Sequence, residues 1–188
     1  MDDDSLDSLA DAWQRPAGIF VVVDVRGPAG ERIRQLQQRY DPKLAGTNPP
    51  HLTLIGSSGV GPIVGDTSED ELRMRLEPIA RSIAPFRLSF GRTTKFMQRD
   101  VVVLPLDPHG PLRALHDRIV RSGLVFNRAR YMFTPHVTLN LFRSLPREEL
   151  RALLSERVDE ALVVDHLRFS LTDDPAPSRN LFELPLTG

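Results

Sequence analysis

The sequence predicts an α+β fold made of two similar halves, on the strength of three observations. Short apolar runs rich in valine, isoleucine and leucine, which are typical of buried strands, alternate with longer segments whose apolar residues recur at helical spacing. A five-residue motif occurs once in each half, as Pro-His-Leu-Thr-Leu at 50–54 and Pro-His-Val-Thr-Leu at 135–139. With 188 residues, of which 40% are hydrophobic, the chain is long enough for one large domain or two interlocked lobes.

The first half opens with a strand and a helix. Residues 19–23, Ile-Phe-Val-Val-Val, predict a buried strand. Pro28 stands at the start of a helical segment whose apolar residues keep their spacing up to Tyr40. A loop over 41–50 then leads into the first motif strand.

A glycine-rich connection and a second helix complete this half. Residues 68–71, Ser-Glu-Asp-Glu, form a capping box that predicts the start of the helix, and apolar residues continue at helical spacing to Ile83. Pro78 lies inside this segment and should bend or split the helix, because proline lacks the N–H that an interior position donates.

The second half repeats this order in outline. Strands are expected over 86–90 and 101–106, a helix from Pro111 to about Gly123, and the second motif strand up to about Phe142. The chain then closes with a helix that opens at Pro146 and with strands over 162–171 and 181–186, joined by a proline-rich turn at 174–178.

Both copies of the motif direct a histidine and a threonine to one face of a strand. Because side chains alternate with a period of two, His51 shares a face with Thr53, and His136 shares a face with Thr138. A proline before each histidine suits a strand start, where its missing N–H costs no ladder bond. A single histidine on a strand is more often structural than catalytic, and the duplication is what favours a functional interpretation.

These paired motifs, one in each half of a chain of this size, resemble those of the two-histidine (2H) phosphoesterase superfamily, which includes 2′-5′ RNA ligase-like proteins and RNA cyclic phosphodiesterases. The resemblance implies two pseudo-symmetric lobes, each an antiparallel-rich sheet flanked by helices, with a central cleft between the two motif strands. It also implies that His51 and His136 are the catalytic pair and that Thr53 and Thr138 hold phosphate oxygens.

Two histidines facing one phosphodiester satisfy the requirements of in-line cleavage. One imidazole deprotonates the attacking oxygen and the other protonates the leaving oxygen. With ordinary pKa values near 6.5, one ring can be neutral while the other is charged, so the sequence predicts catalysis without a metal or cofactor. The threonine hydroxyls can donate to the non-bridging oxygens, where negative charge is held during transfer.

The substrate implied is an RNA-type phosphoester, most naturally a 2′,3′-cyclic phosphate opened by water, with RNA ends or small cyclic nucleotides as partners. The reverse reaction would form a 2′-5′ linkage. Residues 55–58 and 140–143 depart from the pattern that ligase-like members commonly show after the motifs, so short 2′-5′ oligonucleotides and nucleotide-sugar cyclic phosphates also stay open. A rival interpretation is a non-catalytic nucleotide or RNA-end-binding module that retains the fold.

Further substrate contacts are expected just before and after the second motif. Tyr131 or Phe133 could stack on a base, and Arg130 or Arg143 could neutralise a phosphate. If the strand already begins near Tyr131, period two turns Phe133 away from the face of His136, which makes burial in the core an equal alternative for Phe133. His109, His116 and His166 are assigned no chemistry.

Composition and charge narrow the class of protein. The chain has no cysteine, so it has no disulfide framework or thiol nucleophile, and it lacks a His-Glu-x-x-His zinc motif. Residues 1–15 form an acidic segment that we expect to be a disordered tail, while 16–188 form the single bilobal domain and are mildly basic. No signal-peptide or membrane-spanning pattern is recognisable, so a cytoplasmic monomer without membrane contact is expected.

Overall fold

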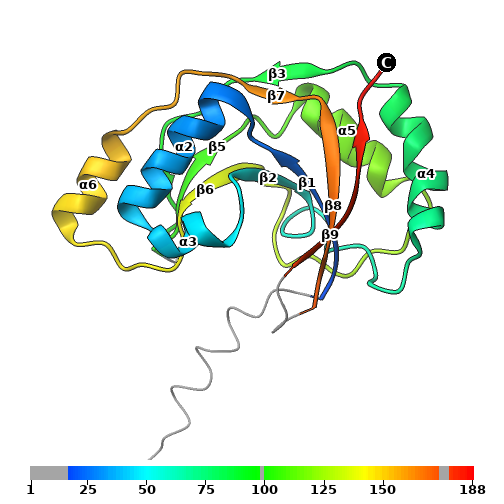
Figure 1. Cartoon of the computed structure of the whole chain (residues 1–188), viewed down its shortest axis with the longest axis horizontal. Helices are drawn as coiled ribbons and strands as arrows, with labels where there is room; N and C mark the ends of the chain where they lie inside the picture. The colour runs from blue at the N-terminus through cyan, green and yellow to red at the C-terminus, as the bar shows by residue number, and fades with distance from the viewer. Residues whose placement is uncertain (1–16, 98–99, 174–177) are drawn as a thin grey trace, which may run out of the picture.

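The computed structural model describes residues 17–97, 100–173 and 178–188, and its centre is one antiparallel sheet of seven strands (Figure 1). The strand order is β4-β5-β6-β2-β1-β8-β9. In chain order these strands are β1 (Gly18–Asp24), β2 (His51–Ile55), β4 (Thr94–Lys95), β5 (Val102–Pro105), β6 (His136–Asn140), β8 (His166–Thr172) and β9 (Arg179–Pro185). Two further strands, β3 (Phe86–Leu88) and β7 (Leu162–Val164), pair as a separate antiparallel ribbon.

The two motif strands are neighbours at the middle of the large sheet. β2 pairs with β6 in antiparallel orientation, with Leu52 opposite Val137. This pairing brings His51 to the side of Thr138 and Thr53 to the side of His136, so an approximate twofold axis passes between the strands. The two halves therefore share one continuous sheet that is joined at the motif itself.

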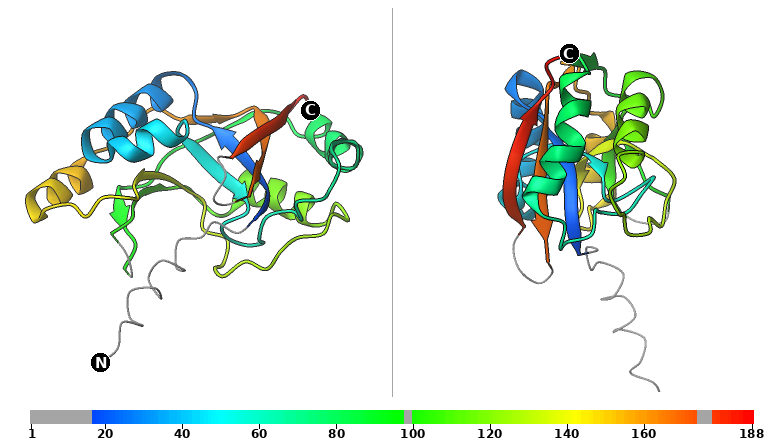
Figure 2. Two further views of the ribbon diagram at one scale, coloured as in Figure 1. Left: turned by 60° about the horizontal axis from the view of Figure 1, so that its bottom comes forward. Right: turned by 90° about the vertical axis from the view of Figure 1, so that its right-hand side faces the viewer.

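The helices gather in two groups at opposite ends of the sheet (Figures 1 and 2). One group holds α2 (Gly27–Tyr40), α3 (Pro42–Thr47) and α6 (Arg147–Ser155), and the other holds α4 (Glu69–Arg81) and α5 (Gly110–Val120). α2 contacts β6 and α6, whereas α4 contacts β9 and α5. Each group thus combines a helix from the first half with one from the second, and the two lobes are interlocked. The predicted α+β class, antiparallel strands flanked by helices, is confirmed.

The core lies on the side of the sheet that faces away from the motif histidines. Leu52, Leu54, Val137 and Leu139 are at most 1% exposed, while the histidines and threonines between them are half-buried, as the period of two predicts. Full burial of one such leucine or valine stabilises the fold by about 1.5–3 kcal/mol relative to exposure. Packing of the aliphatic residues therefore fixes which face of each strand carries the polar pair.

The start of α4 follows the predicted capping box, because the Ser68 hydroxyl accepts a hydrogen bond from the Glu71 N–H at 3.2 Å. Of the two effects predicted for Pro78, a bend or a split, the split does not occur. α4 runs unbroken from Glu69 to Arg81 with Pro78 inside its last turn, and the helix ends three residues after the proline. The helix ends at Arg81, two residues short of the predicted Ile83.

Two elements were not predicted, and one predicted strand is divided. α3 occupies most of the expected loop 41–50, where the Asp41 carboxylate caps the Leu44 N–H at 3.1 Å. β4 has only two residues, too few for a recognisable pattern. The predicted strand over 162–171 is divided at Asp165 into β7 and β8. The acidic segment 1–15 and most of the turn at 174–178 lie outside the described residues.

No helix in the described part of the chain has the length and apolar character needed to cross a bilayer.

Candidate active site

The four motif side chains line one pocket of about 240 Å³ on the open face of the sheet. His51 and Thr53 enter it from β2, and His136 and Thr138 enter it from β6. The structure thus brings together the four residues that the repeated motif singled out.

The two imidazoles are held in the same way. His51 Nδ1 lies 2.8 Å from the backbone carbonyl oxygen of Pro49, and His136 Nδ1 lies 2.7 Å from that of Thr134. A carbonyl oxygen can only accept, so the proton of each neutral ring resides on Nδ1. Nε2 of each ring is therefore the atom that exchanges a proton with a ligand.

His136 stands in a less hydrated environment than an ordinary histidine. Burial lowers its pKa from the ordinary value, and the hydrogen bond with Thr134 offsets this only in part. The ring of Phe96 packs edge-on against the imidazole, with ring centroids 5.1 Å apart. The neutral form of His136 is favoured at neutral pH.

A wall from the neighbouring strands extends the pocket beyond the motif. β1 contributes two apolar side chains to this wall, Phe20 and Val22, and β8 contributes three polar ones, Arg168, Ser170 and Thr172. Ser178, just before β9, also lines the pocket. Sequence analysis missed this wall. The signal was present, because polar residues alternate with Leu167, Phe169 and Leu171 along 166–172.

Arg168 is fixed at the base of this wall. Its side chain is 9% exposed, Nε and Nη2 donate to the Asp24 carboxylate at 2.8–3.0 Å, and Nη1 donates to Ser170 and Asn180 at 2.6 Å. Burial by itself raises the pKa of Asp24, but hydrogen bonds from His166 and Arg168 outweigh it and hold that pKa far below the usual range. The positive charge of Arg168 beside the pocket is therefore compensated by the negative charge of Asp24.

His166 belongs to the same network behind the site. Its Nδ1 lies 2.6 Å from Asp165 Oδ1, and its Nε2 lies 3.2 Å from the Asp24 amide nitrogen and 3.7 Å from Asp24 Oδ2. Burial lowers the pKa of His166, but the bonds with Asp24 and Asp165 reverse the effect, so the pKa is raised. His166, to which the sequence analysis assigned no chemistry, thus accepts a hydrogen bond from the Asp24 backbone N–H beside the ion pair.

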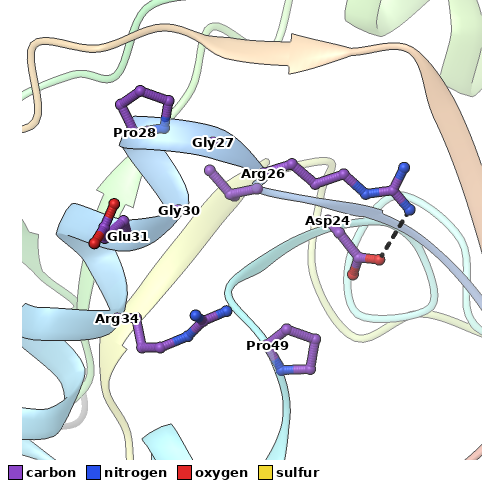
Figure 3. Close-up of a pocket in the computed structure, with 9 residues that line it drawn as sticks. Asp24, Arg26, Gly27, Pro28, Gly30, Glu31, Arg34 and Pro49 are labelled. Carbon is purple, nitrogen blue, oxygen red and sulfur yellow. Dashed lines mark ion pairs between the residues drawn. The ribbon is translucent and has the colours of Figure 1, made fainter.

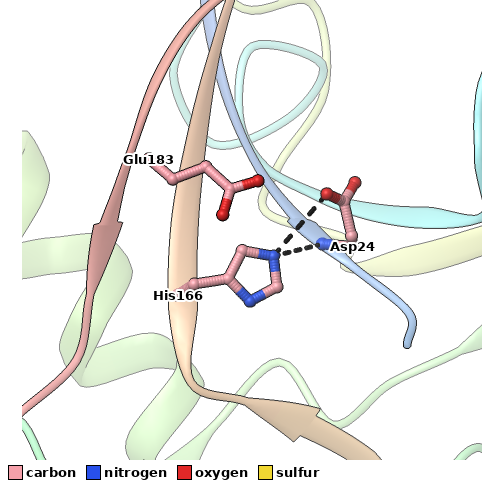
Figure 4. Close-up of side chains that lie close together, drawn as sticks. All are labelled: Asp24, His166 and Glu183. Atoms are coloured by element: carbon pink, nitrogen blue, oxygen red, sulfur yellow. Dashed lines mark hydrogen bonds and ion pairs between the residues drawn. The ribbon is translucent and has the colours of Figure 1, made fainter. Parts of the chain in front are cut away.

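Asp24, His166 and Glu183 converge closely enough to suggest a cation site (Figure 4). Their partners argue against one. The Asp24 carboxylate is bound by Arg168, and the Glu183 carboxylate is bound by Arg26 at 2.8 and 2.9 Å. A cation in this cluster would face two guanidinium groups. We therefore interpret the cluster of Asp24, His166 and Glu183 as part of an ion-pair network.

A second hollow, about 550 Å³, lies at the start of α2 (Figure 3). Arg26, Glu31, Arg34 and Pro49 line it, and the figure shows the ion pair of Arg26 with Asp24 at 3.8 Å. None of the motif side chains reaches this hollow. It is larger than the motif pocket but lacks the convergent acid-base groups.

The four further candidates for substrate contacts do not line the motif pocket. Arg130 and Tyr131 are exposed in the segment before β6, which begins only at His136. Phe133 stacks against the buried His116, with ring centroids 4.1 Å apart. Arg143 binds Glu149 at 2.8 Å and the Tyr40 carbonyl at 3.3 Å. The structure engages Phe133 and Arg143 elsewhere and leaves Arg130 and Tyr131 on the surface.

Comparison with known proteins identifies a family for most of the chain. A sequence model of the 2′-5′ RNA ligase superfamily matches residues 25–175. No curated protein matches the chain in sequence.

Solved structures resemble the fold over nearly the whole chain. The protein TT0787 of Thermus thermophilus superposes with a TM-score of 0.62 at 19% identity, covering 90% of this chain and 98% of its own. Escherichia coli LigT in its apo form gives 0.57 at 20% identity, covering 93% and 100%. Its complex with 3′-AMP gives 0.51 at 18% identity, covering 92% and 99%. The family match spans most of the chain, and the protein therefore belongs to the 2′-5′ RNA ligase superfamily of 2H phosphoesterases.

Proposed function

We propose that this protein is a metal-independent phosphodiesterase that opens 2′,3′-cyclic phosphates of RNA-type substrates, with His51 and His136 as its acid-base pair. The observation that carries the proposal is the matched hydrogen bonding of the two rings. Each Nδ1–H is held by the carbonyl two residues earlier, and both rings line one pocket. Such a pair can take up a proton on one side of phosphorus and deliver one on the other.

His136 suits the role of base. Its lowered pKa favours the neutral ring, whose Nε2 accepts the proton of the attacking water. The water oxygen bonds to phosphorus as the bond from phosphorus to one ribose oxygen breaks. His51, protonated on both nitrogens, donates its Nε2 proton to that leaving oxygen, and the product is a phosphate monoester. Proton exchange with solvent then returns both rings to their starting states.

Thr53 and Thr138 complete the site from between the two rings. Their hydroxyl groups line the pocket and can donate to the non-bridging oxygens, which carry negative charge throughout the transfer. A preorganised donor of this kind is worth about 10²–10³-fold in rate. A 5′-hydroxyl in place of water would run the same chemistry towards a 2′-5′ linkage. Hydrolysis is the favoured direction because water is the abundant nucleophile in an open pocket.

Ligands bound by a structural relative support a phosphate-binding pocket. E. coli LigT has been crystallised with phosphate and with 3′-AMP. A nucleotide that carries its phosphate at the 3′ position is the type of product that opening a cyclic phosphate yields. A non-catalytic binding module would not need two histidines with the same orientation, whereas acid-base catalysis uses both.

The experiment that tests the proposal measures hydrolysis of 2′,3′-cyclic nucleotides, and of a short RNA ending in a cyclic phosphate, in excess chelator. We expect turnover by the parent and a loss of at least about 10³-fold in both His51→Ala and His136→Ala. His109→Ala is the matched control, since His109 is exposed at the start of α5, away from the pocket. A folded parent that turns over neither substrate, or histidine variants as active as the parent, would indicate a non-catalytic binding module.

A further inference from the structure

The two motif strands are paired with each other over a very short length. Among the described residues, β2 and β6 are paired at one position, Leu52 with Val137, whereas β1 pairs with β8 at five positions. The two histidines stand on these different strands, so the distance between the rings depends on how the strands are placed relative to each other. Contacts from outside the sheet are therefore needed to fix this placement.

Asp41 binds the end of β6 from the corner between α2 and α3. This residue is 1% exposed. Its Oδ2 accepts hydrogen bonds from the backbone N–H groups of Leu141 and Phe142, each at 2.8 Å. Its Oδ1 accepts from the Leu44 N–H at 3.1 Å, in the first turn of α3. One buried carboxyl group thus joins the end of β6 to the start of α3.

Helix α3 carries this connection onwards to His51. Asn48, Pro49 and Pro50 are the three residues between the end of α3 and His51 at the start of β2. The φ angles of the two prolines are fixed by their rings, and the Pro49 carbonyl oxygen lies 2.8 Å from His51 Nδ1. A displacement of α3 would therefore reach the imidazole of His51 through a short, stiff segment.

Gln37 binds β6 one helical turn before Asp41. Its Nε2 donates to the backbone carbonyl oxygen of Thr138 at 2.8 Å, at the position beside His51 in the sheet. Gln37 is 3% exposed, and its Oε1 has no hydrogen-bond partner in the described part of the chain. An unsatisfied buried oxygen destabilises a fold, and an apolar side chain at this position would avoid it. The contact with Thr138 thus points to a role other than stability.

We propose that Gln37 and Asp41 are positioning residues, which hold β6 against the connection from α3 to β2 and so set the distance between His51 and His136. We call their contacts with β6 the β6 clamp. The inference rests on the proposed function, because this distance matters when both rings act on one phosphate. Neither residue lines the pocket, and each acts through the backbone of β6 or its end.

A clamp outside the pocket can control the rate because in-line transfer depends on geometry. One ring has to reach the attacking oxygen while the other reaches the leaving oxygen on the far side of phosphorus. A misplacement of about 1 Å at a reaction centre can lower the rate by about 10²-fold. Loss of the β6 clamp would therefore lower kcat even in a protein that stays folded.

The test compares two clamp variants with a variant of a different helix cap. Gln37→Met removes the donor to Thr138 and keeps a side chain of similar length. Asp41→Asn keeps an oxygen that can cap α3, but it presents N–H donors to the two backbone N–H groups that bind Oδ2 in the parent. Ser68→Ala is the matched control, because it removes the cap of α4, a helix in the other group and outside the pocket lining.

The parent and the variants are assayed with a 2′,3′-cyclic nucleotide at a temperature well below every melting temperature. We expect Gln37→Met and Asp41→Asn each to lower kcat by at least about tenfold, with KM changed less than about threefold. Ser68→Ala should lower the melting temperature and leave kcat within about twofold of the parent. A role in stability alone would leave kcat unchanged in all folded variants, so kcat distinguishes the two roles.

The outcomes separate the β6 clamp from the proposed function. Clamp variants that keep the kcat of the parent, or a control that loses as much, would overturn the clamp and leave the hydrolytic function intact. Gln37→Met decides the question alone if Asp41→Asn does not fold.

A parent that hydrolyses no cyclic phosphate would overturn the proposed function, and NMR of the histidine ring protons then tests the β6 clamp by itself. We expect Gln37→Met and Asp41→Asn to shift the ring signals of at least one of His51 and His136. The signals of His109, which is exposed at the start of α5, should stay in place. Unchanged signals of both pocket histidines would overturn the clamp.

Discussion

Phe96 packs edge-on against His136, with ring planes 88° apart and centroids 5.1 Å apart. The contact removes water from one side of the imidazole, and burial is the main reason that the pKa of His136 is lowered. Phe96→Ala should admit water and move this pKa upwards, towards the ordinary 6.5. If His136 is the base, the rising limb of the pH–rate profile moves to higher pH by the same amount.

An NMR titration of the His136 ring protons measures this shift directly, independently of activity. Phe142→Ala is the control, because Phe142 is also partly exposed but packs against Lys43, with Nζ 4.6 Å from the ring centroid. A pKa of His136 that stays unchanged or falls in Phe96→Ala would show that Phe96 does not set the hydration of the ring.

Thr53 and Thr138 should affect the rate more than they affect stability. Both side chains are half-buried and line the pocket, and valine keeps the β-branched shape while removing the hydroxyl donor. We expect Thr53→Val and Thr138→Val each to lower kcat by about 10²-fold, with the melting temperature nearly unchanged. Steady-state kinetics together with thermal unfolding tests this. A rise in KM with kcat unchanged would assign the hydroxyls to ground-state binding alone.

The four central residues of the site could be predicted from the sequence, because the repeated motif itself shows which side chains share a face of each strand. Once His51-x-Thr53 and His136-x-Thr138 are placed on strands, the period of two sets both polar pairs on one face. Direct pairing of β2 with β6 depends on tertiary packing, and no local pattern in either strand encodes it.

The sequence shows that residues 166–172 have one polar face, but it does not show that this face lies beside the motif residues. Arg168 is distant from both motifs along the chain, and it reaches the pocket only because β8 pairs with β1. In contrast, Arg130 and Tyr131 were chosen for being near His136 in sequence, but the chain reaches β6 through an irregular segment that leaves them exposed. Proximity along the chain therefore did not place these two residues in the lining of the motif pocket.

Gly56→Ala should lower the stability of the fold. The added Cβ would meet the Phe20 ring at 2.2 Å, and alanine is disfavoured at a φ of +136°. We expect a loss of about 1–3 kcal/mol in the free energy of unfolding, measured by urea denaturation. Gly46→Ala is a suitable control, because a Cβ at position 46 meets no atom within 4 Å and lies within α3. Equal stabilities of the two variants would contradict the close approach of Gly56 to Phe20.

The pair of Asp24 and Arg168 should be the most sensitive polar contact in the sheet. Their side chains are 12% and 9% exposed, so Asp24→Asn leaves a guanidinium group buried without its counter-charge. We expect a loss of about 3 kcal/mol in the free energy of unfolding at pH 7, with partial recovery in Asp24→Asn/Arg168→Met. Glu77→Gln removes surface ion pairs with Arg73 and Arg81 on α4, and it should lower the free energy of unfolding by less than about 0.5 kcal/mol.

The effect of Asp24 should become smaller in acid. Folding lowers its pKa, so its carboxylate contributes stability that is fully present well above the ordinary value of 3.8. This contribution decreases as the pH falls below 3.8 and is lost completely only when the pH falls through the much lower pKa of the folded state. Urea denaturation of the parent and Asp24→Asn at pH 7 and pH 3 should therefore show a large difference at the higher pH and a smaller one at the lower. A difference that stays constant between the two pH values would mean that the pair contributes through shape and hydrogen bonding, without its charge.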